Sequence, residues 1–359
     1  MIRHRLRRIA SAALPTVATL VAFELILRAF PGLVPIDVGT AIYSVYGTGP
    51  GDIYFYDEPT RANFMWPNYR TRAYWNGYVW EHRTDELGFR NPDDLNARSI
   101  VWLGDSMIYG HGVEEEDTAV ARLRREHGLA AYNAGRQGDC LYQEYLVARL
   151  LLREVAPRTL VLSVFMNDFE DLEVYRTPEE IAVPPELSLD VGALAARLEH
   201  PVTRFRPRRE LQRLKLWRLA DLVGKRIGKR RAAPPADAGP PSFVRPLVED
   251  ARWTPIANYY ERMIGDLAER SRAAGAELVL LDLDIGDQVI ADARPGLDRL
   301  HELLASIARE HALRLLDTRS SFETCKAACF LPHDGHLSPE GHRRLADLVA
   351  SALREPGPV

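Results

Sequence analysis

The sequence has little cysteine and no surplus of positive charge. Its three cysteines show none of the Cys/His spacings of zinc sites, and no His-Glu-x-x-His pattern occurs. Lysine and arginine number 46 against 50 aspartates and glutamates, which gives a formal net charge of -4 at pH 7. That balance argues against general nucleic-acid binding. We therefore expect no bound metal and no nucleic-acid partner.

The glycine-rich loops of nucleotide-binding proteins are also missing. Neither Gly-x-Gly-x-x-Gly nor Gly-x-x-x-x-Gly-Lys-Ser/Thr occurs in the chain. The alternative of a nucleotide- or cofactor-binding α/β protein therefore has no phosphate-binding motif behind it, and we expect no cofactor. An apolar content of 46% is ordinary for a globular protein and allows a sizeable core.

An apolar segment follows a basic flank at the N-terminus. The flank consists of Arg3, Arg5, Arg7 and Arg8. The stretch from Ile9 to Phe30 is about 20 residues long, enough to cross a bilayer as a helix. Glu24 and Arg28 interrupt it at a spacing of four, so they can pair on one helical face. We expect residues 1–30 to be an uncleaved membrane anchor. The alternative is a cleaved signal peptide whose apolar part ends at Phe23. Both place the rest of the chain outside the cytoplasm, in the periplasm or its equivalent.

An apolar run ends abruptly at Gly104-Asp105-Ser106. The segment from Ile100 to Leu103 predicts a buried strand. A serine directly after it places a hydroxyl at the carboxyl end of a sheet, where open α/β sheets bind ligands. The tripeptide alone is also typical of an ordinary turn.

Three further blocks follow in order. They are Asn133–Asp139, Phe165–Asp168 and His333–Pro339. Together with Gly104-Asp105-Ser106 they resemble the SGNH (GDSL-type) hydrolase family, over about residues 98–175 and 254–353 with an insertion between. The resemblance implies a serine esterase that works through an acyl-enzyme.

The resemblance also implies a role for each block. Ser106 is the expected nucleophile, His336 the base that takes its proton, and Asp334 the acid that orients the base. The oxyanion hole is expected from the backbone N–H groups of Ser106 and Gly138 and the side-chain amide of Asn167. Gly135 is a rival for the second-block glycine. We favour Gly138 because the following Asp139 matches the usual Gly-Asp pair.

The last block departs from the usual family pattern. Many members place the acid three residues before the catalytic histidine, where this chain has His333. Asp334 lies only two residues before His336, which resembles a variant in membrane-linked relatives, including proteins that acetylate exopolysaccharides. His333 is the rival base, but an adjacent Asp334 would be poorly placed to orient it. We expect His111 to be an exposed loop histidine, and a residue lining the acyl or leaving-group pocket is the alternative.

Strands alternate with helices from residue 99 onward. We expect strands at 99–103, 130–133, 159–165, 277–283 and 314–317, with helices near 117–127, 140–154, 254–274, 297–311 and after Ser338. This alternation predicts a flavodoxin-like α/β/α fold with a parallel sheet in the order 2-1-3-4-5 and right-handed crossovers.

Two segments lie outside this alternation of strands and helices. The aromatic-rich lead-in, 31–98, is expected to pack on the core as short strands and turns, with a carbohydrate-binding platform as the alternative. The insertion at about 170–253 contains the basic amphipathic stretch Arg204–Arg231 and the linker Pro234–Pro241. That stretch predicts either a helix packed on the domain or a lid or lipid-surface helix. The hydrolase domain is thus expected to span 99–353.

The pairing of the cysteines depends on whether the protein lies in an oxidising compartment. Cys325 and Cys329 form either a small disulfide, as an oxidising compartment allows, or two thiols. Cys140 is expected to be a small buried hydrophobic residue.

These observations predict a serine ester hydrolase that acts outside the cytoplasm on a small-molecule, glycan or lipid ester. An O-acyltransferase that modifies cell-envelope or exopolysaccharide sugars shares the same acyl-enzyme and is the first alternative. A catalytically inactive glycan-binding module on the same fold is the second.

Overall fold

The computed structural model describes residues 2–92, 95, 98–201, 210–229, 242–285 and 293–354, with side chains from Leu14 onward except at 227–229 and 242. The basic flank and the linker 234–241 therefore lie outside the described side chains. The chain divides into two compact units. One comprises Met1–Phe55, Ala73–Val79 and Val202–Asp237, and the other Tyr56–Arg72, Trp80–Pro201 and Ala238–Val359.

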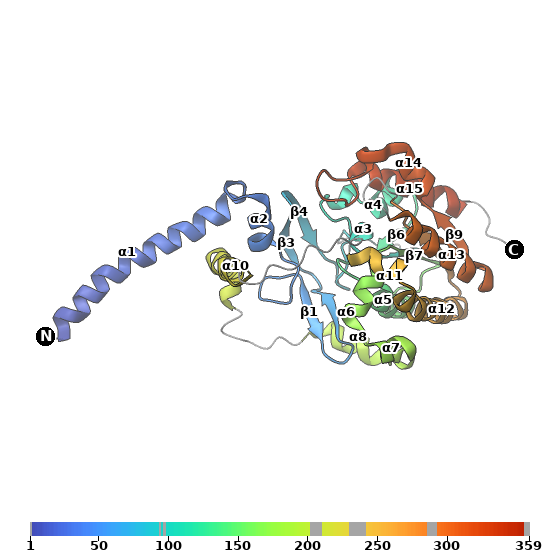
Figure 1. Cartoon of the computed structure of the whole chain (residues 1–359), viewed down its shortest axis with the longest axis horizontal. Helices are drawn as coiled ribbons and strands as arrows, with labels where there is room; N and C mark the ends of the chain where they lie inside the picture. Colours follow the sequence, from blue (N-terminus) through green and yellow to red (C-terminus); the bar gives the residue numbers. More distant parts are fainter. Residues whose placement is uncertain are drawn as a thin grey trace. The chain divides into compact units, whose positions relative to one another are not determined.

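A five-stranded parallel sheet forms the centre of the second unit (Figure 1). Its strands are β5 (Ile100–Leu103), β6 (Ala131–Asn133), β7 (Thr159–Val164), β8 (Glu277–Asp282) and β9 (Arg314–Asp317). They lie in the order β6-β5-β7-β8-β9, and every neighbouring pair is parallel. This order is the predicted 2-1-3-4-5, which is thereby confirmed. All four residues of β5 are buried, as expected for a strand covered on both faces.

Two groups of helices pack on this sheet. The first consists of α4 (Ala119–His127), α14 (Arg319–Cys325) and α15 (Pro339–Arg354), and the second of α5 (Leu141–Glu154), α12 (Asp250–Ala273) and α13 (Arg294–Glu310). Within each group neighbouring helices contact one another, and α4, α5, α12 and α13 contact the strands. Right-handed crossovers place the two groups on opposite faces, so the α/β/α layering is as predicted.

The described part of the insertion adds short helices to the second unit and contains no strand. They are α6 (Asp168–Tyr175), α7 (Pro178–Ala182), η3 (Pro185–Ser188), α8 (Val191–Glu199), η5 (Ser242–Val244) and α11 (Arg245–Val248). Short helices elsewhere are α3 (Ser106–Tyr109), η2 (Glu115–Asp117) and η6 (Lys326–Cys329). The lead-in forms the two-stranded sheets β1–β2 (Tyr54–Asp57, Ala62–Met65) and β3–β4 (Arg70–Trp75, Tyr78–Arg83).

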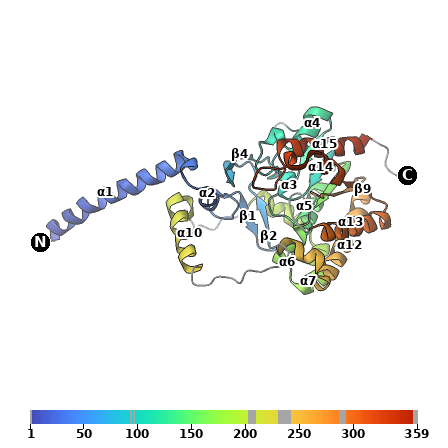
Figure 2. The ribbon, with the colours of Figure 1, turned by 45° about the horizontal axis from the view of Figure 1, so that its top comes forward.

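In the first unit, α10 packs against α1 and α2 (Figures 1 and 2). The elements are α1 (Ile2–Ala29), η1 (Pro31–Leu33), α2 (Ile36–Tyr43), η4 (Leu211–Arg213) and α10 (Lys215–Lys229). Arg28 pairs with Glu24 at 2.7 Å, as their spacing predicted. The Glu24 carboxylate also accepts the backbone N–H groups of Lys215 and Leu216 at 3.1 and 3.0 Å. Glu24 thus satisfies the free N–H groups at the start of α10, where negative charge is favourable.

The described residues contain no helix that is both long and apolar enough to cross a membrane. The membrane-spanning helix expected in residues 1–30 is therefore not supported, although α1 is helical there. Polar Thr16 and Thr19 and charged Glu24 and Arg28 lower the mean hydropathy of this helix.

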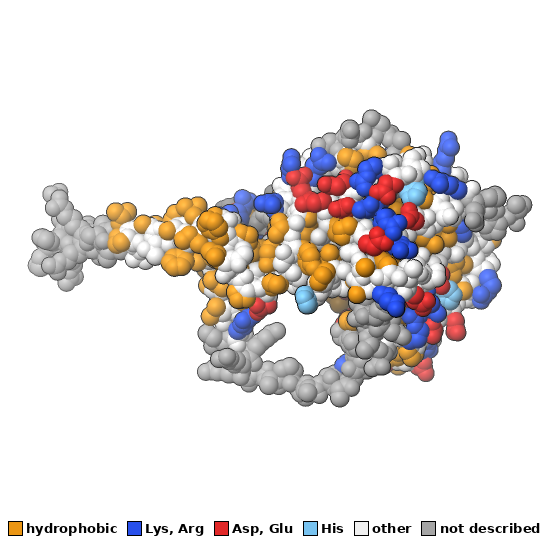
Figure 3. Space-filling model, turned by 90° about the horizontal axis from the view of Figure 1, so that it is seen from above, with side chains coloured by type: hydrophobic (Ala, Val, Ile, Leu, Met, Phe, Trp, Pro, Cys, Tyr) orange, Lys and Arg blue, Asp and Glu red, His pale blue; other side chains and the backbone are white. Residues whose placement is uncertain are grey.

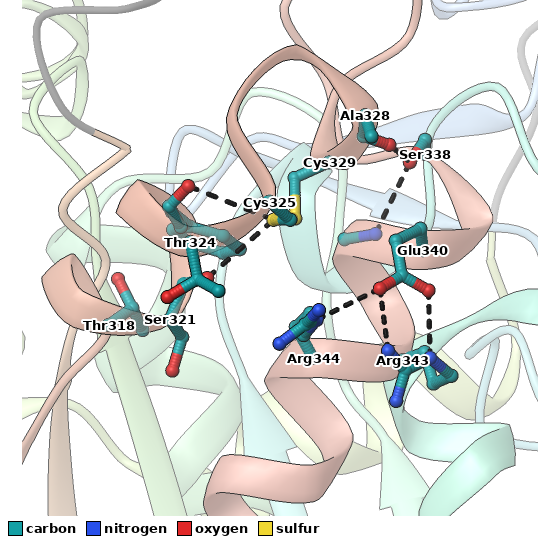
Figure 4. Close-up of a disulfide and its surroundings, with 12 residues drawn as sticks. Thr318, Ser321, Thr324, Cys325, Ala328, Cys329, Ser338, Glu340, Arg343 and Arg344 are labelled. Carbon is teal, nitrogen blue, oxygen red and sulfur yellow. Dashed lines mark hydrogen bonds and ion pairs between the residues drawn. A yellow bond between two sulfur atoms is a disulfide. The ribbon is translucent and has the colours of Figure 1, made fainter.

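Cys325 and Cys329 are joined in a disulfide with Cα atoms 5.6 Å apart (Figure 4). The bridge lies where α14 ends and η6 begins. The Cys329 carbonyl accepts the N–H of Ser338 at 2.8 Å, and the Ser338 hydroxyl donates to the Ala328 carbonyl at 2.5 Å. The disulfide therefore borders the loop that carries His336. Cys140 is free and buried, which confirms its expected role.

Candidate active site

Ser106 is the first residue of the short helix α3, directly after strand β5. Asp105 caps this helix, because its Oδ1 accepts the N–H of Met107 at 2.9 Å. A Cβ atom on Gly104 would lie 2.4 Å from Ile108 Cγ1, so a side chain there would collide with the helix. Gly104 and Asp105 thus shape the strand-to-helix turn that presents the Ser106 hydroxyl.

The structure brings Ser106, His336 and Asp334 together. Ser106 Oγ lies 2.9 Å from His336 Nε2, and His336 Nδ1 is hydrogen-bonded to Asp334 Oδ1. The Asp334 side chain is only 1% exposed. With Nδ1–H donating to the buried carboxylate, Nε2 is left as the acceptor for the serine proton. This is the geometry that nucleophilic catalysis by serine needs.

A tight turn explains how an acid two residues before the histidine reaches it. His333 and Gly335 both have left-handed backbone angles, with φ of +63° and +85°. Leu331 closes the turn, since its N–H donates to the His336 carbonyl at 2.7 Å. The turn folds the Asp334 carboxylate back toward the imidazole. His333 is exposed and takes no part in the hydrogen bonds that join Ser106, His336 and Asp334.

Strands β6 and β7 flank β5, so the loops after them lie on either side of Ser106. Gly138 follows β6 with a left-handed φ of +68°, and a Cβ there would meet nothing within 4 Å. A Cβ on Gly135, by contrast, would lie 2.3 Å from the Tyr109 backbone nitrogen. Gly135 therefore has a packing role against α3. Gly138 has open space beside it, and its place in the oxyanion hole stays a prediction.

Asn167 follows β7 and precedes helix α6. Its Nδ2 donates to Asp171 Oδ2 at 3.1 Å, one helical turn further on. Asp168 has a structural role, since its Oδ2 accepts the Phe165 N–H at 2.9 Å. Asp171 thus fixes the orientation of the Asn167 amide. Sequence reasoning missed Asp171, although the i, i+4 spacing on a helix was a signal that was available.

Replacement of Asn167 by alanine should lower kcat about 10²- to 10³-fold, which is the usual cost of losing one oxyanion donor. The expected loss is in kcat because the negative charge develops only in the transition state. Kinetics on an activated ester will measure this. A matched Asp171→Ala variant, which keeps the amide but frees it, should lose less than Asn167→Ala. An Asn167→Ala variant with unchanged kcat would show that Asn167 is not an oxyanion donor.

Four buried carboxyl groups and one half-buried one lie around the Ser106 strand end. The buried groups are Asp105, Asp139, Glu144 and Asp168, and the half-buried one is Asp171. Arg136 pairs with Asp139 at 2.6 Å. Both carboxyl oxygens of Glu144 are buried without a hydrogen-bond partner among the described residues. Burial, followed by the nearby Asp139, raises the pKa of Glu144 well above its ordinary value. Burial of both oxygens therefore favours the neutral form of Glu144 inside the fold.

A Glu144→Gln variant should gain stability relative to the wild type as pH rises. The folded state holds the Glu144 proton that the unfolded chain releases above about pH 4.5. The free energy of unfolding of the wild type therefore falls by up to about 1.4 kcal/mol per pH unit above that value, until the folded-state pKa of Glu144 is reached. The Glu144→Gln variant has no proton to release at this position and does not show this fall. Melting temperatures of both proteins at about pH 5 and about pH 8 will measure the difference. An equal difference at both pH values would contradict this assignment.

His111 is buried, so the expectation of an exposed loop histidine was wrong. It is 2% exposed, and its ring stacks on the His336 ring with centroids 3.9 Å apart and planes 19° apart. The Trp80 ring packs against the His111 ring with centroids 4.8 Å apart, and Gln137 is hydrogen-bonded to His111 Nδ1. Burial, followed by the nearby His336, lowers the pKa of His111 to about 3. The histidine that stacks on His336 is therefore uncharged at neutral pH.

Two groups of side chains within the described residues have ligand atoms close enough to hold a metal ion. One is His111, Asp334 and His336, where both nitrogens of His336 already engage Asp334 and Ser106. The other is Asp282, His301 and Asp317 near the ends of β8 and β9, where His301 Nδ1 and Asp282 Oδ2 are 2.8 Å apart. In the first group the nitrogens of His336 are already hydrogen-bonded, and the second group contains a hydrogen bond between His301 and Asp282.

No family model and no curated protein matches the chain. Solved structures do match. The esterase EstA from Pseudoalteromonas sp. is 12% identical, with a TM-score of 0.41, and the match covers 71% of this chain and 98% of EstA. The acetyl xylan esterase AlAXEase is 14% identical, with a TM-score of 0.40 and the same coverage of 71% and 98%. TesA is 15% identical, with a TM-score of 0.40 and coverage of 71% and 97%.

The features of this chain itself carry the assignment. Four sequence blocks follow one another in order, and the strand order brings three of them to one edge of the sheet. The fourth block supplies the histidine that contacts the serine and the acid that is hydrogen-bonded to that histidine. In its sequence blocks, its sheet order and its Ser106–His336–Asp334 arrangement, the chain resembles the SGNH (GDSL-type) hydrolases.

Proposed function

We propose that the protein is a serine-dependent ester hydrolase that forms an acyl-enzyme on Ser106. The observation that carries the proposal is the 2.9 Å contact between Ser106 Oγ and His336 Nε2, with Asp334 on the opposite ring nitrogen. A serine hydroxyl is too weak an acid to react unaided at neutral pH, and this contact supplies the base.

The reaction follows from this geometry. His336 takes the Ser106 proton while Oγ attacks the ester carbonyl, and Asp334 stabilises the imidazolium that forms. The oxyanion meets the N–H groups of Ser106 and Gly138 and the Asn167 amide. The C–O bond of the ester then breaks, and His336 gives its proton to the departing alcohol. Water attacks the acyl-enzyme with His336 again as base, which releases the acid and restores Ser106.

Turnover of p-nitrophenyl acetate tests the proposal. The wild-type protein should release p-nitrophenol catalytically, and Ser106→Ala should not. Equal rates for the two proteins would refute it. A series of longer acyl chains on the same alcohol will then define the acyl group that the site accepts.

Acyl transfer to a sugar shares every step up to the acyl-enzyme. The same assay separates the two activities when a sugar acceptor is added, because a transferase forms an acetylated sugar at the expense of free acetate. A glycan-binding module without catalysis would bind the sugar and leave the ester intact. The joined Ser106, His336 and Asp334 favour catalysis over this last alternative.

We further propose that the protein acts outside the cytoplasm. The Cys325–Cys329 disulfide supports this location, because disulfides persist mainly in oxidising compartments. Thiol alkylation of the protein as isolated from its native cells, before and after reduction, tests the idea. Two cysteines should react only after reduction. Full alkylation without reduction would place the protein in a reducing compartment.

The exposed apolar side chains of α1 support association with a membrane. Every residue from Leu14 to Phe23 is exposed, and Figure 3 shows apolar side chains along the described part of this helix. Apolar surface of this kind is favourable to bury among lipid chains. Co-sedimentation with lipid vesicles tests the association. Replacement of Val17, Leu20 and Phe23 by serine should abolish it, and unchanged binding would contradict it.

A further inference from the structure

His111 occupies a position that the proposed reaction leaves unexplained. It directly follows Gly110 at the end of α3, the helix that begins with Ser106, and its backbone N–H donates to the Ser106 carbonyl at 3.1 Å. Its side chain returns toward the catalytic base and lies face to face with the His336 ring, at a centroid distance of 3.9 Å. The ring is therefore tied to the nucleophile through the backbone and to the base through stacking.

The surroundings fix the His111 ring in this place. Gln137, the residue before Gly138, is hydrogen-bonded to Nδ1. The Trp80 ring packs against the imidazole, with the two ring centroids 4.8 Å apart. Arg90 holds the loop that carries His111, donating to the carbonyls of Tyr109, Gly110 and Val113 at 3.2, 2.8 and 2.8 Å. Such a constrained ring has little freedom to leave the face of the catalytic imidazole.

The charge state of His111 decides what stacking can do. The charged or titratable groups that face it are His336 and Asp334 from the catalytic loop and Arg90 from the segment after β4. A protonated His111 would repel the imidazolium that forms on His336. A neutral ring presents a π face to that cation at contact distance, and this attraction is strongest where water is excluded.

We propose that His111 is a positioning residue whose neutral ring stabilises the protonated form of His336 during the proposed acyl transfer. The attraction arises only after the Ser106 proton has moved to His336 Nε2. It therefore lowers the barrier of the chemical step and leaves substrate binding largely unchanged. This inference rests on the proposed ester hydrolysis.

Two variants of similar size separate an aromatic face from simple filling of space. His111→Phe keeps an aromatic face, whereas His111→Leu removes it. We expect His111→Phe to stay within about threefold of the wild-type kcat, and His111→Leu to lose about 3- to 30-fold with little change in KM. The acidic limb of the kcat–pH profile should also move to lower pH in His111→Leu, because no aromatic ring then stabilises the His336 imidazolium.

Active-site titration with a fluorophosphonate will normalise each rate to the folded, reactive fraction, so that partial unfolding does not count as lost catalysis. His111→Met serves as a second non-aromatic variant and should behave like His111→Leu. Equal kcat values and equal acidic limbs for the Phe, Leu and Met variants would overturn the role of the aromatic face. A wild-type protein that neither reacts with the fluorophosphonate nor hydrolyses the ester would instead refute the proposed function.

Discussion

Replacement of His336 by alanine is expected to lower kcat/KM about 10⁴- to 10⁶-fold on an activated ester, the range found when the base of a serine triad is removed. The reason is the contact of its Nε2 with Ser106 Oγ at 2.9 Å. Without that acceptor the serine proton has no place to go, and the oxyanion donors alone give only residual catalysis. Steady-state kinetics of the purified variant will measure the loss.

His333 offers the matched control for this experiment. It lies three residues before His336 in the same loop and is exposed. It takes no part in the hydrogen bonds that join Ser106, His336 and Asp334. His333→Ala should keep kcat/KM within about threefold of wild type, as is usual for exposed positions away from the chemistry. If His333→Ala lost more activity than His336→Ala, the assignment of the base would be wrong.

Replacement of Asp334 by asparagine should lower kcat about 10²- to 10⁴-fold while leaving the fold intact. The Asp334 carboxylate accepts the Nδ1–H of His336 and so leaves Nε2 free to accept the serine proton. An amide that donates to Nδ1 would favour the opposite tautomer, in which Nε2 carries a hydrogen and cannot act as base.

Asp334→Glu distinguishes orientation from charge alone. The tight turn between His333 and Gly335 sets the reach of this side chain, so a longer carboxylate retains the charge but misplaces it. We expect this variant to lose activity as well, though less than Asp334→Asn. A fully active Asp334→Asn would show that another group orients the imidazole.

The sheet and the order of the catalytic blocks could be predicted from the sequence because both depend on local patterns. Largely apolar runs such as Ile100–Leu103 and Thr159–Val164 predict buried strands, and each is followed directly by one of the four blocks. The carboxyl ends of parallel strands share one edge, so the blocks had to meet. The observed order β6-β5-β7-β8-β9 agrees with that reasoning.

The environment of single side chains could not be predicted in this way. His111 follows a glycine in a polar-looking loop, which is typical of exposure. It is buried because Trp80 packs against it and Arg90 binds three carbonyls of its loop. Both partners come from the lead-in, far from His111 in sequence. Contacts of that kind depend on tertiary packing and leave no periodic signal.

Glu24 shows the same limit in the first unit. Its spacing from Arg28 predicted their ion pair, which the structure contains. Its role at the start of α10 depends on Lys215 and Leu216, about 190 residues further along the chain. A charge that looked like an interruption of an apolar helix therefore has a second structural role.

Covalent labelling is the most direct test of the central claim that Ser106 is a nucleophile activated by His336. The protein would be treated with a fluorophosphonate, and the site of the adduct would be identified by peptide mass spectrometry. The account predicts a single adduct on Ser106, absent in Ser106→Ala and formed far more slowly in His336→Ala. Ester hydrolysis without an adduct on Ser106, or an adduct on another serine, would contradict it.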